Sequence, residues 1–537
     1  MKNIYTVDVK GITTSSSSFE QFIRRDMLYV DKTSYIYNLV KNPARNFYFI
    51  SRPRRFGKSL FCATLESLFK GEKELFKGLY INDRYDFKPY PVLRFELSNM
   101  PLLDIDGFIS DLRYKVESAA EGYPLEFREN EAPSTMLSRA IDTLYREYGE
   151  VVIIIDEYDA PLTSTLSNPE MAEKIRSVLN SFYATLKNKA AKIRFCFLTG
   201  VVKLSNLSIF SAMNNLVDLS MDKEFSGAFG YTDEELDEYF GDGIDEYLEA
   251  NPGVYESREE FREKIRDYYD GYRFSPESET RVYNPVSIGF FFYKECTFSN
   301  YWDKTGNSSF AVELARRHNL KDILIDDSVL SEFALSSFDI SDINNDNIPD
   351  SKILAMLYQT GYLTIKDYNE LGYTLKFPNM EVSSTFSLSL IGRYIGNEEI
   401  ADNLSGVIKM ACRLGDAAMM MDAVEKYFAA FPYGDEKPDE RTYQGRLYGL
   451  FAASLRKPVS REVKTSNGRI DLVIASDKDI WIFELKVDKS ADAALRQIDE
   501  KDYASAYGYL FDSHKIHKIG ISFSSKTRRV AEWKLSS

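Results

Sequence analysis

Cysteine and histidine are scarce in this chain of 537 residues. It has four cysteines, at positions 62, 196, 296 and 412, and no CxxC pair. We therefore expect neither a disulfide framework nor a structural zinc site, and a reducing compartment fits this composition. Because there are three histidines in all, histidine-rich metal chemistry and a Ser-His-Asp triad are not expected. His514 and His517 flank a strand-like run and are expected at the surface.

Long hydrophobic runs are also absent. No apolar stretch approaches the roughly 18 residues of a membrane-spanning helix, and the first residues, MKNIYTVDVK, lack the hydrophobic core of a signal peptide. We therefore expect a cytoplasmic protein without a membrane segment. Acidic residues (82) outnumber Lys and Arg (67), so the net charge of −15 excludes a polycation that coats nucleic acid along its whole length.

Hydrophobic residues, by contrast, are plentiful. They make up 44% of the chain, and aromatic residues make up 14%, which is enough for packed cores and excludes a mainly disordered chain. At about 150 residues per domain, the length suggests about three domains.

The first 220 residues alternate between short apolar runs and helical patterns. One amphipathic helix is expected at Leu60–Phe69, where apolar residues recur every three or four positions. Strands that alternate with helices indicate a parallel sheet covered on both faces. The expected strands are Phe47–Ile50, Val92–Leu97, Val151–Ile155, Ile193–Leu198 and Leu216–Leu219.

A phosphate-binding loop is predicted between the first strand and this helix. Residues 52–59 read RPRRFGKS, which matches the end of the P-loop pattern but has Arg52 in place of the first glycine. Gly57 would allow a close approach of the backbone, Lys58 would reach the β- and γ-phosphates, and the Ser59 hydroxyl would bind Mg²⁺. Three arginines could add positive charge to the phosphate site: Arg52, Arg54 and Arg55. Of these, Arg54 and Arg55 are predicted to bind the nucleotide.

Two acids follow the apolar run at residues 151–155. Asp156 is predicted to hold Mg²⁺, and Glu157 to act as the general base that activates water. Thr199, at the end of the next run, would sense the γ-phosphate. The extra strand between the loop and the acids is typical of the additional-strand ATPase class, and no NKxD guanine motif is present, so ATP is the expected nucleotide.

The region from about residue 231 to 431 is mainly helical in pattern. Amphipathic helices are expected at Asp233–Phe240, Arg258–Tyr269 and Ser351–Tyr358, and the last is followed by a hairpin around Asn369–Gly372. This order fits a winged-helix module and equally an α+β lid. Arg273 could act as a sensor or finger towards a nucleotide phosphate. The acidic segment at residues 431–440 is expected to be a linker.

The last hundred residues form a separate pattern with a net charge of +4, which hints at anion binding. We expect helices at Glu440–Ser454 and Ala491–Tyr509, three strands between them and one strand after. Asp471 on one strand and Glu484 and Lys486 on the next have the spacing D-x12-E-x-K, which matches the PD-(D/E)XK nuclease pattern. Two carboxylates would hold Mg²⁺ or Mn²⁺, and the lysine would orient the attacking water.

Further residues could contribute to this site. Glu440 or Glu462 could supply another carboxylate, and Gln497 and Tyr503 are similar to the Gln-Tyr motif of RecB-like nucleases, although their spacing is wider. The alternative is an ordinary half-exposed strand with a surface Glu–Lys pair.

Six segments together resemble the bacterial AAA-ATPase-like family. They are YVDKTSYIYNL (29–39), SRPRRFGKSLF (51–61), VVIIIDEYDAPL (151–162), FLTGVVKLSNLSIFSAMNNLVDLS (197–220), YYDGYRFS (268–275) and VYNPVS (282–287). The resemblance implies an ATPase joined to a C-terminal nuclease-fold domain of the PD-(D/E)XK superfamily, and RPRRFGKS is the usual form of the loop in that family.

The resulting hypothesis has three domains: an AAA-like P-loop ATPase at residues 1–230, a helical lid or middle region at 231–435, and a nuclease-like domain at 436–537. It predicts an ATP- and Mg²⁺-dependent hydrolase whose C-terminal domain acts on DNA or RNA. Two alternatives stay open. One is an ATP-gated switch with an inactive nuclease fold that binds nucleic acid or protein, and the other is a signalling ATPase whose tail binds only protein.

Overall fold

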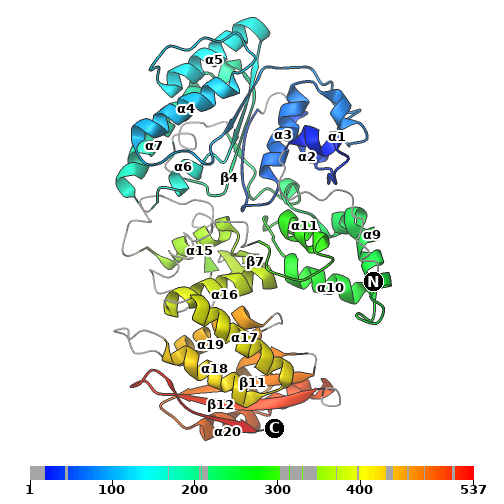
Figure 1. The fold of residues 1–537 in the computed structure, drawn as a ribbon, viewed down its shortest axis with the longest axis vertical. Helices are drawn as coiled ribbons and strands as arrows, with labels where there is room; N and C mark the ends of the chain where they lie inside the picture. The colour runs from blue at the N-terminus through cyan, green and yellow to red at the C-terminus, as the bar shows by residue number, and fades with distance from the viewer. Residues whose placement is uncertain are drawn as a thin grey trace, which may run out of the picture. The chain divides into compact units, whose positions relative to one another are not determined.

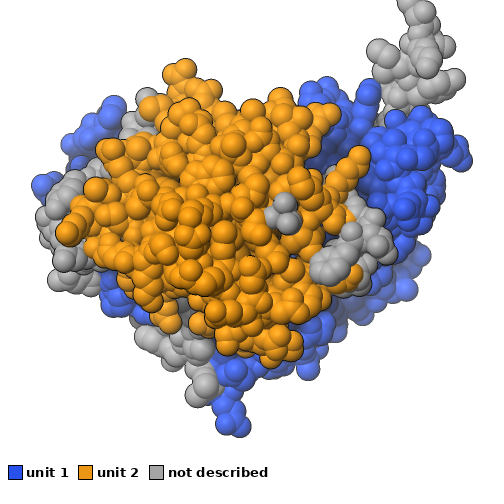
Figure 2. All heavy atoms as spheres, turned by 90° about the horizontal axis from the view of Figure 1, so that it is seen from below, with its two compact units in different colours: residues 1–306, 329–378 blue, residues 307–328, 379–537 orange. Residues whose placement is uncertain are grey.

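The computed structural model describes two compact units of the chain. The described residues are 18–42, 46–166, 168–204, 207, 216–302, 314, 329–330, 348–370, 372–395, 398–430, 439–455, 459–476, 478–510 and 514–536. Unit 1 comprises residues 1–306 and 329–378, and unit 2 comprises residues 307–328 and 379–537 (Figure 2). The three-domain division remains a prediction, since its second boundary and most of the expected linker lie outside the described residues.

Unit 1 is built on a five-stranded parallel sheet with the order β2-β3-β4-β1-β5. All five strands expected from the apolar runs are present, although the last is shorter than predicted. The run VVIIID of the internal strand β3 has no exposed residue, as expected for a strand covered on both faces. The strands are β1 (Phe47–Ser51), β2 (Val92–Glu96), β3 (Val151–Asp156), β4 (Ile193–Gly200) and β5 (Val217–Asp218).

Helices cover both faces of this sheet. The helix α3, predicted from residue 60, begins at Lys58 and packs on β2, β3 and β4, whereas α4, α5 and α7 form a group on the other side (Figure 1). The helices of this part are α1 (Phe19–Arg24), α2 (Thr33–Val40), α3 (Lys58–Phe69), α4 (Ile105–Ala119), α5 (Pro133–Tyr148), α6 (Ala160–Thr163) and α7 (Pro169–Asn188).

The rest of unit 1 is helical with one small sheet. The three helices predicted there are present, and the hairpin after the third is antiparallel and joins β6 in the order β6-β8-β7. The choice between a winged helix and an α+β lid stays a prediction. The elements are α9 (Asp233–Ala250), α10 (Arg258–Tyr269), α11 (Pro285–Tyr293), α15 (Asp350–Thr360), β6 (Val329–Leu330), β7 (Thr364–Asn369) and β8 (Gly372–Lys376).

Unit 2 packs helices on a five-stranded mixed sheet with the order β13-β12-β11-β10-β9. β11 and β12 are parallel, and the other neighbours are antiparallel. The main core lies between this sheet and the helices. The elements are α16 (Met380–Ile395), α17 (Glu398–Leu414), α18 (Ala417–Ala429), α19 (Glu440–Ser454), α20 (Ala491–Glu500), β9 (Val459–Thr465), β10 (Gly468–Ala475), β11 (Asp479–Val487), β12 (Lys515–Phe523) and β13 (Val530–Ser536).

Three features of unit 2 differ from the sequence-based expectation. The long helix predicted to Tyr509 ends at Glu500 and is followed by a 3₁₀ segment, because Asp502 has a positive φ and Tyr503 turns into the core. The strand β13 was not predicted. The surface position expected for His517 is wrong, since its ring is buried, stacks on Trp481 at 3.9 Å and lies 2.7 Å from Asp479.

No helix among the described residues combines the length and the apolar character needed to cross a membrane.

The carboxyl ends of β3 and β4 are tied together by buried hydrogen bonds. The Asp159 carboxylate accepts from the N–H groups of Val201 and Val202, and the Tyr158 hydroxyl donates to the Val202 carbonyl. Gly200 lies directly against both side chains, so that a Cβ there would meet Asp159 Oδ1 and come within 2.6 Å of the Tyr158 ring. The two strand ends are therefore held in one position relative to each other.

Replacing Gly200 by Ala should destabilise unit 1 by about 1–3 kcal/mol, because the added methyl group overpacks this junction. Thermal unfolding of the full chain would show a lower midpoint. Gly241→Ala in α9 is the matched control, since a Cβ there meets only the mobile end of Arg258. Equal midpoints for both variants would contradict the prediction.

Candidate functional site

The loop between β1 and α3 turns sharply just before the helix begins. Arg55 and Gly57 both have positive φ values, of 71° and 88°. Nothing lies within 4 Å of a Cβ built on Gly57, so its backbone conformation, not space, favours glycine there. No side chain caps α3 at Gly57, which leaves the first N–H groups of the helix available to an anion.

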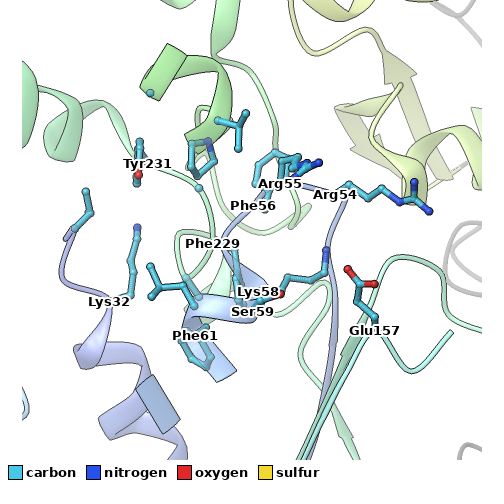
Figure 3. A pocket seen from close by; sticks show the side chains of 18 of the residues that line it. Lys32, Arg54, Arg55, Phe56, Lys58, Ser59, Phe61, Glu157, Phe229 and Tyr231 are labelled. Carbon is cyan, nitrogen blue, oxygen red and sulfur yellow. The ribbon is translucent and has the colours of Figure 1, made fainter. Parts of the chain in front are cut away.

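Lys58 lies over this loop and is buried. Its ammonium group donates hydrogen bonds of 2.9 Å to the carbonyl groups of Arg52 and Pro53. Burial lowers the pKa of Lys58, while the carboxylates of Asp156 and Glu157 act in the opposite direction. In Figure 3 the side chains of Lys58 and Glu157 approach each other from α3 and from the end of β3.

Asp156 and Thr199 lie at the ends of β3 and β4 with no exposed surface. Neither the Asp156 carboxylate oxygens nor the Thr199 hydroxyl has a hydrogen-bond partner among the described residues. Burial raises the pKa of Asp156, and Ser59 and Lys58 partly offset that effect. Since an unpaired buried carboxylate is costly, a cation shared with Ser59 would fit this position.

A cavity of about 550 Å³ opens in front of these residues, within the usual range for small-molecule sites. Of the residues predicted for nucleotide binding, six line its walls: Arg54, Arg55, Gly57, Lys58, Ser59 and Glu157. Asp156 and Thr199 are not in the lining. Burial raises the pKa of Glu157, and the neighbouring Asp156 carboxylate raises it further. A raised pKa favours the predicted role of this residue as a proton acceptor.

The other end of the cavity is largely apolar and aromatic. Its walls come from the segment before α2, from the turn before α9 and from α11 (Figure 3). The lining residues there include Tyr29, Val30, Phe229, Tyr231, Phe240 and Val286. The cavity is thus charged at one end and suited to a flat, apolar group at the other.

Two arginines considered as phosphate ligands have other roles. The Arg52 guanidinium is buried, donates to the carbonyl groups of Ser220 and Phe225, and lies 4.3 Å from the Phe274 ring centre. Burial lowers its pKa to about 10. The suggestion that Arg273 contacts a nucleotide phosphate does not fit the structure. Its guanidinium group donates to backbone carbonyl groups, such as that of Ser278, and to Glu279.

Lys32 is a lining residue that sequence reasoning missed. Its buried ammonium group donates to both carboxylate oxygens of Glu235 at 2.6 Å and to the Gly227 carbonyl at 2.7 Å. Glu235 also completes a capping box with Thr232 at the start of α9. The pattern T-x-x-E signals this helix start, but nothing local to Lys32 indicates that it contacts Glu235 about 200 positions later.

The second candidate site lies on β10 and β11 of unit 2. The two strands form an antiparallel pair, and their register sets Asp471 beside Glu484. The Leu485 N–H donates to Asp471 Oδ2 at 2.8 Å. The Lys486 ammonium donates to Glu484 Oε1 at 3.0 Å, so the two side chains share a face, as their spacing implies. The structure therefore brings the three predicted residues together.

The electrostatics of this cluster suit a cation. Burial raises the pKa of Asp471 to about 6 and, with the added repulsion of Asp471, that of Glu484 to about 8. Glu484 Oε2 is buried without a hydrogen-bond partner among the described residues. Among the residues that the structure describes, no group of three or more His, Cys, Asp or Glu side chains could hold a metal ion. The cluster thus offers two carboxylates, and Mg²⁺ commonly keeps waters as its other ligands.

Of the further residues considered for this cluster, one lies near Lys486 and the others make contacts elsewhere. Glu440 lies 3.6 Å from the Lys486 ammonium, whereas Glu462 forms an ion pair with Arg469. Gln497 donates to the Tyr503 hydroxyl, which in turn donates to the Arg469 carbonyl. Gln497 and Tyr503 therefore support the turn of the β9–β10 hairpin.

Gln444 on α19 was not foreseen. Its amide group donates to Glu462 Oε1 at 2.7 Å and to the Asp471 carbonyl at 2.8 Å, so it fixes the backbone of the acidic strand. No sequence signal marks it, because a glutamine in a helix is normally a surface residue.

Comparisons with known proteins identify the families that match the two ends of the chain. Residues 13–210 match the model of a family described as Predicted AAA-ATPase, and residues 438–533 match that of the PD-(D/E)XK nuclease superfamily. An "Uncharacterized protein in vnfD 5'region" from Azotobacter chroococcum mcd 1 is 33% identical over 520 residues, which cover 94% of each chain. The chain belongs to the predicted AAA-ATPase family. It also carries a C-terminal PD-(D/E)XK superfamily domain, and the resemblance inferred from its motifs is confirmed.

Two solved structures of Aeropyrum pernix proteins are more distant. The ORC2 protein is 13% identical, with 80% of this chain and 85% of that chain covered and a TM-score of 0.30. The ORC1 protein in complex with DNA is 11% identical, with 66% and 91% covered and a TM-score of 0.25. Membership of the family rests on the family models and the relative, not on these two structures.

Binding of Mn²⁺ to unit 2 should be roughly tenfold or more tighter at pH 8 than at pH 6. At pH 6, Glu484, with its pKa of about 8, is largely protonated and Asp471, with its pKa of about 6, is about half protonated, whereas a cation needs both carboxylates ionised. Isothermal titration of the full chain measures the affinity, with Glu484→Gln as the control that should weaken binding and flatten its pH dependence. Equal affinity of the wild type at the two pH values would contradict the prediction.

Proposed function

We propose that the protein binds and hydrolyses ATP in the cavity of unit 1 and that the domain carrying Asp471, Glu484 and Lys486 is a metal-dependent nuclease. The observation that carries the first part is the gathering of Lys58, Ser59 and Glu157 around one cavity in front of the unpaired Asp156 carboxylate.

The triphosphate would occupy the charged end of the cavity. The free N–H groups at the start of α3 would bind phosphate oxygens, and Lys58 would leave the Arg52 and Pro53 carbonyl groups to contact the β- and γ-phosphates. Arg54 and Arg55, in the walls of the same end, would add positive charge. The adenine ring would fill the apolar end beside Tyr231.

Hydrolysis would use the acids at the end of β3. Ser59 and Asp156 would hold Mg²⁺, which neutralises charge on the phosphates when bound. Glu157 would accept a proton from the attacking water, and its raised pKa favours that role. Thr199, whose hydroxyl has no other partner in the described part of the chain, would contact the γ-phosphate.

Replacing Lys58 by Ala should abolish ATP binding, because it removes the ammonium group nearest the phosphates. Glu157→Gln should keep binding but lower turnover at least about a hundredfold, because the base is lost. Nucleotide titration and phosphate release measure the two effects. Lys77→Ala, at an exposed position, is the matched control. Normal ATP hydrolysis by the Lys58→Ala variant would refute the ATPase proposal.

Cleavage of a phosphodiester bond would use the unit 2 cluster. Asp471 and Glu484 would hold Mg²⁺ or Mn²⁺, which lowers the pKa of bound water and stabilises negative charge when present. The Lys486 ammonium would orient the water or stabilise the charge that develops on the phosphate. Burial lowers the pKa of Lys486, but Glu484 and Glu440 raise it overall, so the lysine keeps its charge. The polyanion substrate would be DNA or RNA.

Asp471→Ala and Lys486→Ala should each eliminate Mn²⁺-dependent nicking of plasmid DNA and cleavage of short oligonucleotides. Lys489→Ala, an exposed lysine just beyond the strand, should leave cleavage unchanged. Strand scission and phosphate release are followed together, with ATP and metal added in all combinations. If the wild type binds nucleic acid in a salt-dependent way but never cuts it, the ATP-gated binding alternative replaces the nuclease.

A further inference from the structure

The helix α17 has a buried inner side and, next to it around the helix, an exposed apolar stripe that forms its outer side. Its inner side contributes to the core of unit 2 with Ala401, Leu404, Ile408 and Ala411. Its outer side carries four large apolar side chains that are 37–63% exposed: Ile400, Val407, Met410 and Leu414. A surface helix normally has one apolar stripe, which faces the core, whereas the apolar residues of α17 continue beyond the core onto the exposed surface. The outer side of α17 is thus built to be covered.

The outer residues have the spacing of a helix-pairing seam. Ile400, Val407 and Leu414 are seven positions apart, and Asn403 and Met410 repeat the same interval three positions later. This is the a and d pattern of a helix that packs lengthwise against another helix. A single polar residue in such a seam, here Asn403, favours one register over others.

Gly406 lies at the middle of α17, on the line of residues that borders the outer side. It is exposed and has nothing within 4 Å of a Cβ built on it. Glycine is unfavourable inside a helix, and no neighbour in its own chain needs the space. A glycine at this point would let the backbone of a second helix come close.

The charges beside the seam are divided between the two halves of the helix. Glu399 and Asp402 are exposed in the first half, and Lys409 and Arg413 are exposed in the second half. Glu399 and Arg413 are each seven positions from Gly406, and Ile400 and Leu414 are each seven positions from Val407. The helix is therefore complementary to itself when it is turned end for end.

We propose that the outer side of α17 binds the same side of a second copy of this chain, antiparallel about a two-fold axis near Gly406 and Val407. Ile400 then packs against Leu414 of the second copy, and Glu399 faces Arg413 of the second copy. A helix of 17 residues is about 25 Å long. One such pair is a small interface, so association is reversible and depends on concentration.

Charge exchange tests this arrangement. In sedimentation velocity of the full chain over a range of concentrations, the wild type shows a monomer–dimer equilibrium. Glu399→Arg and Arg413→Glu each raise the dissociation constant about tenfold or more, because two attractive pairs become repulsive. The double variant E399R/R413E regains the wild-type constant. A mixture of the two single variants forms a heterodimer, since all its facing pairs are again opposite in sign.

Val407→Asp tests the apolar part of the seam and should abolish the dimer. Glu425→Arg, at an exposed site on the neighbouring α18, is the control for Glu399→Arg because it makes the same change of charge, and it should dimerise normally. Circular dichroism and thermal melting verify that each variant is folded. The proposal is overturned if the wild type stays monomeric at the highest concentration, or if Val407→Asp or the single charge variants dimerise as the wild type does. It is also overturned if the double variant fails to recover, because the antiparallel pairing is then wrong.

Discussion

The parallel pairing of β1, β3 and β4 is the constraint on which the candidate site of unit 1 depends. Because the three strands run in the same direction, their carboxyl ends meet at one edge of the sheet. The loop before Lys58, the acids after Ile155 and the hydroxyl of Thr199 are brought there from positions separated by more than 140 residues. The hydrogen bonds of Tyr158 and Asp159 to the end of β4 then hold that edge together.

Both candidate sites keep a carboxylate in a place that is unfavourable for it. Asp156 and Glu484 are almost fully buried, burial raises the pKa of each, and each has an oxygen without a hydrogen-bond partner among the described residues. Such groups lower the stability of a fold, so their positions are better explained by binding than by structure. The two sites differ in the neighbouring lysine, which contacts loop carbonyl groups in one case and Glu484 itself in the other.

Much of this arrangement could be predicted from local sequence. The strands of unit 1 are apolar runs of strand length, and the D-x12-E-x-K spacing indicates the three residues that the pairing of β10 and β11 brings together. The predictions failed where long-range contacts decide a side chain's surroundings. Arg52 and Arg273 look like phosphate ligands by position but are held by carbonyl groups of distant segments. His517 is buried because its side chain lies on the same face of β12 as Ile519 and Ile521, which belong to the main core, and stacks on Trp481 there.

The position of Arg52 has a consequence for how freely the loop before α3 can vary. Where the usual pattern has a glycine with no side chain, this chain inserts a guanidinium into an aromatic recess, against Phe274 and under the carbonyl groups of Ser220 and Phe225. Replacing Arg52 by glycine would leave a void and two unsatisfied carbonyl groups inside the protein. Lysine at this position would lack the planar guanidinium group that donates to both carbonyl groups at once. The loop before α3 is thus anchored at its first residue by the side chain of Arg52. Which residue can occupy that position therefore depends on distant contacts, including the one with Phe274.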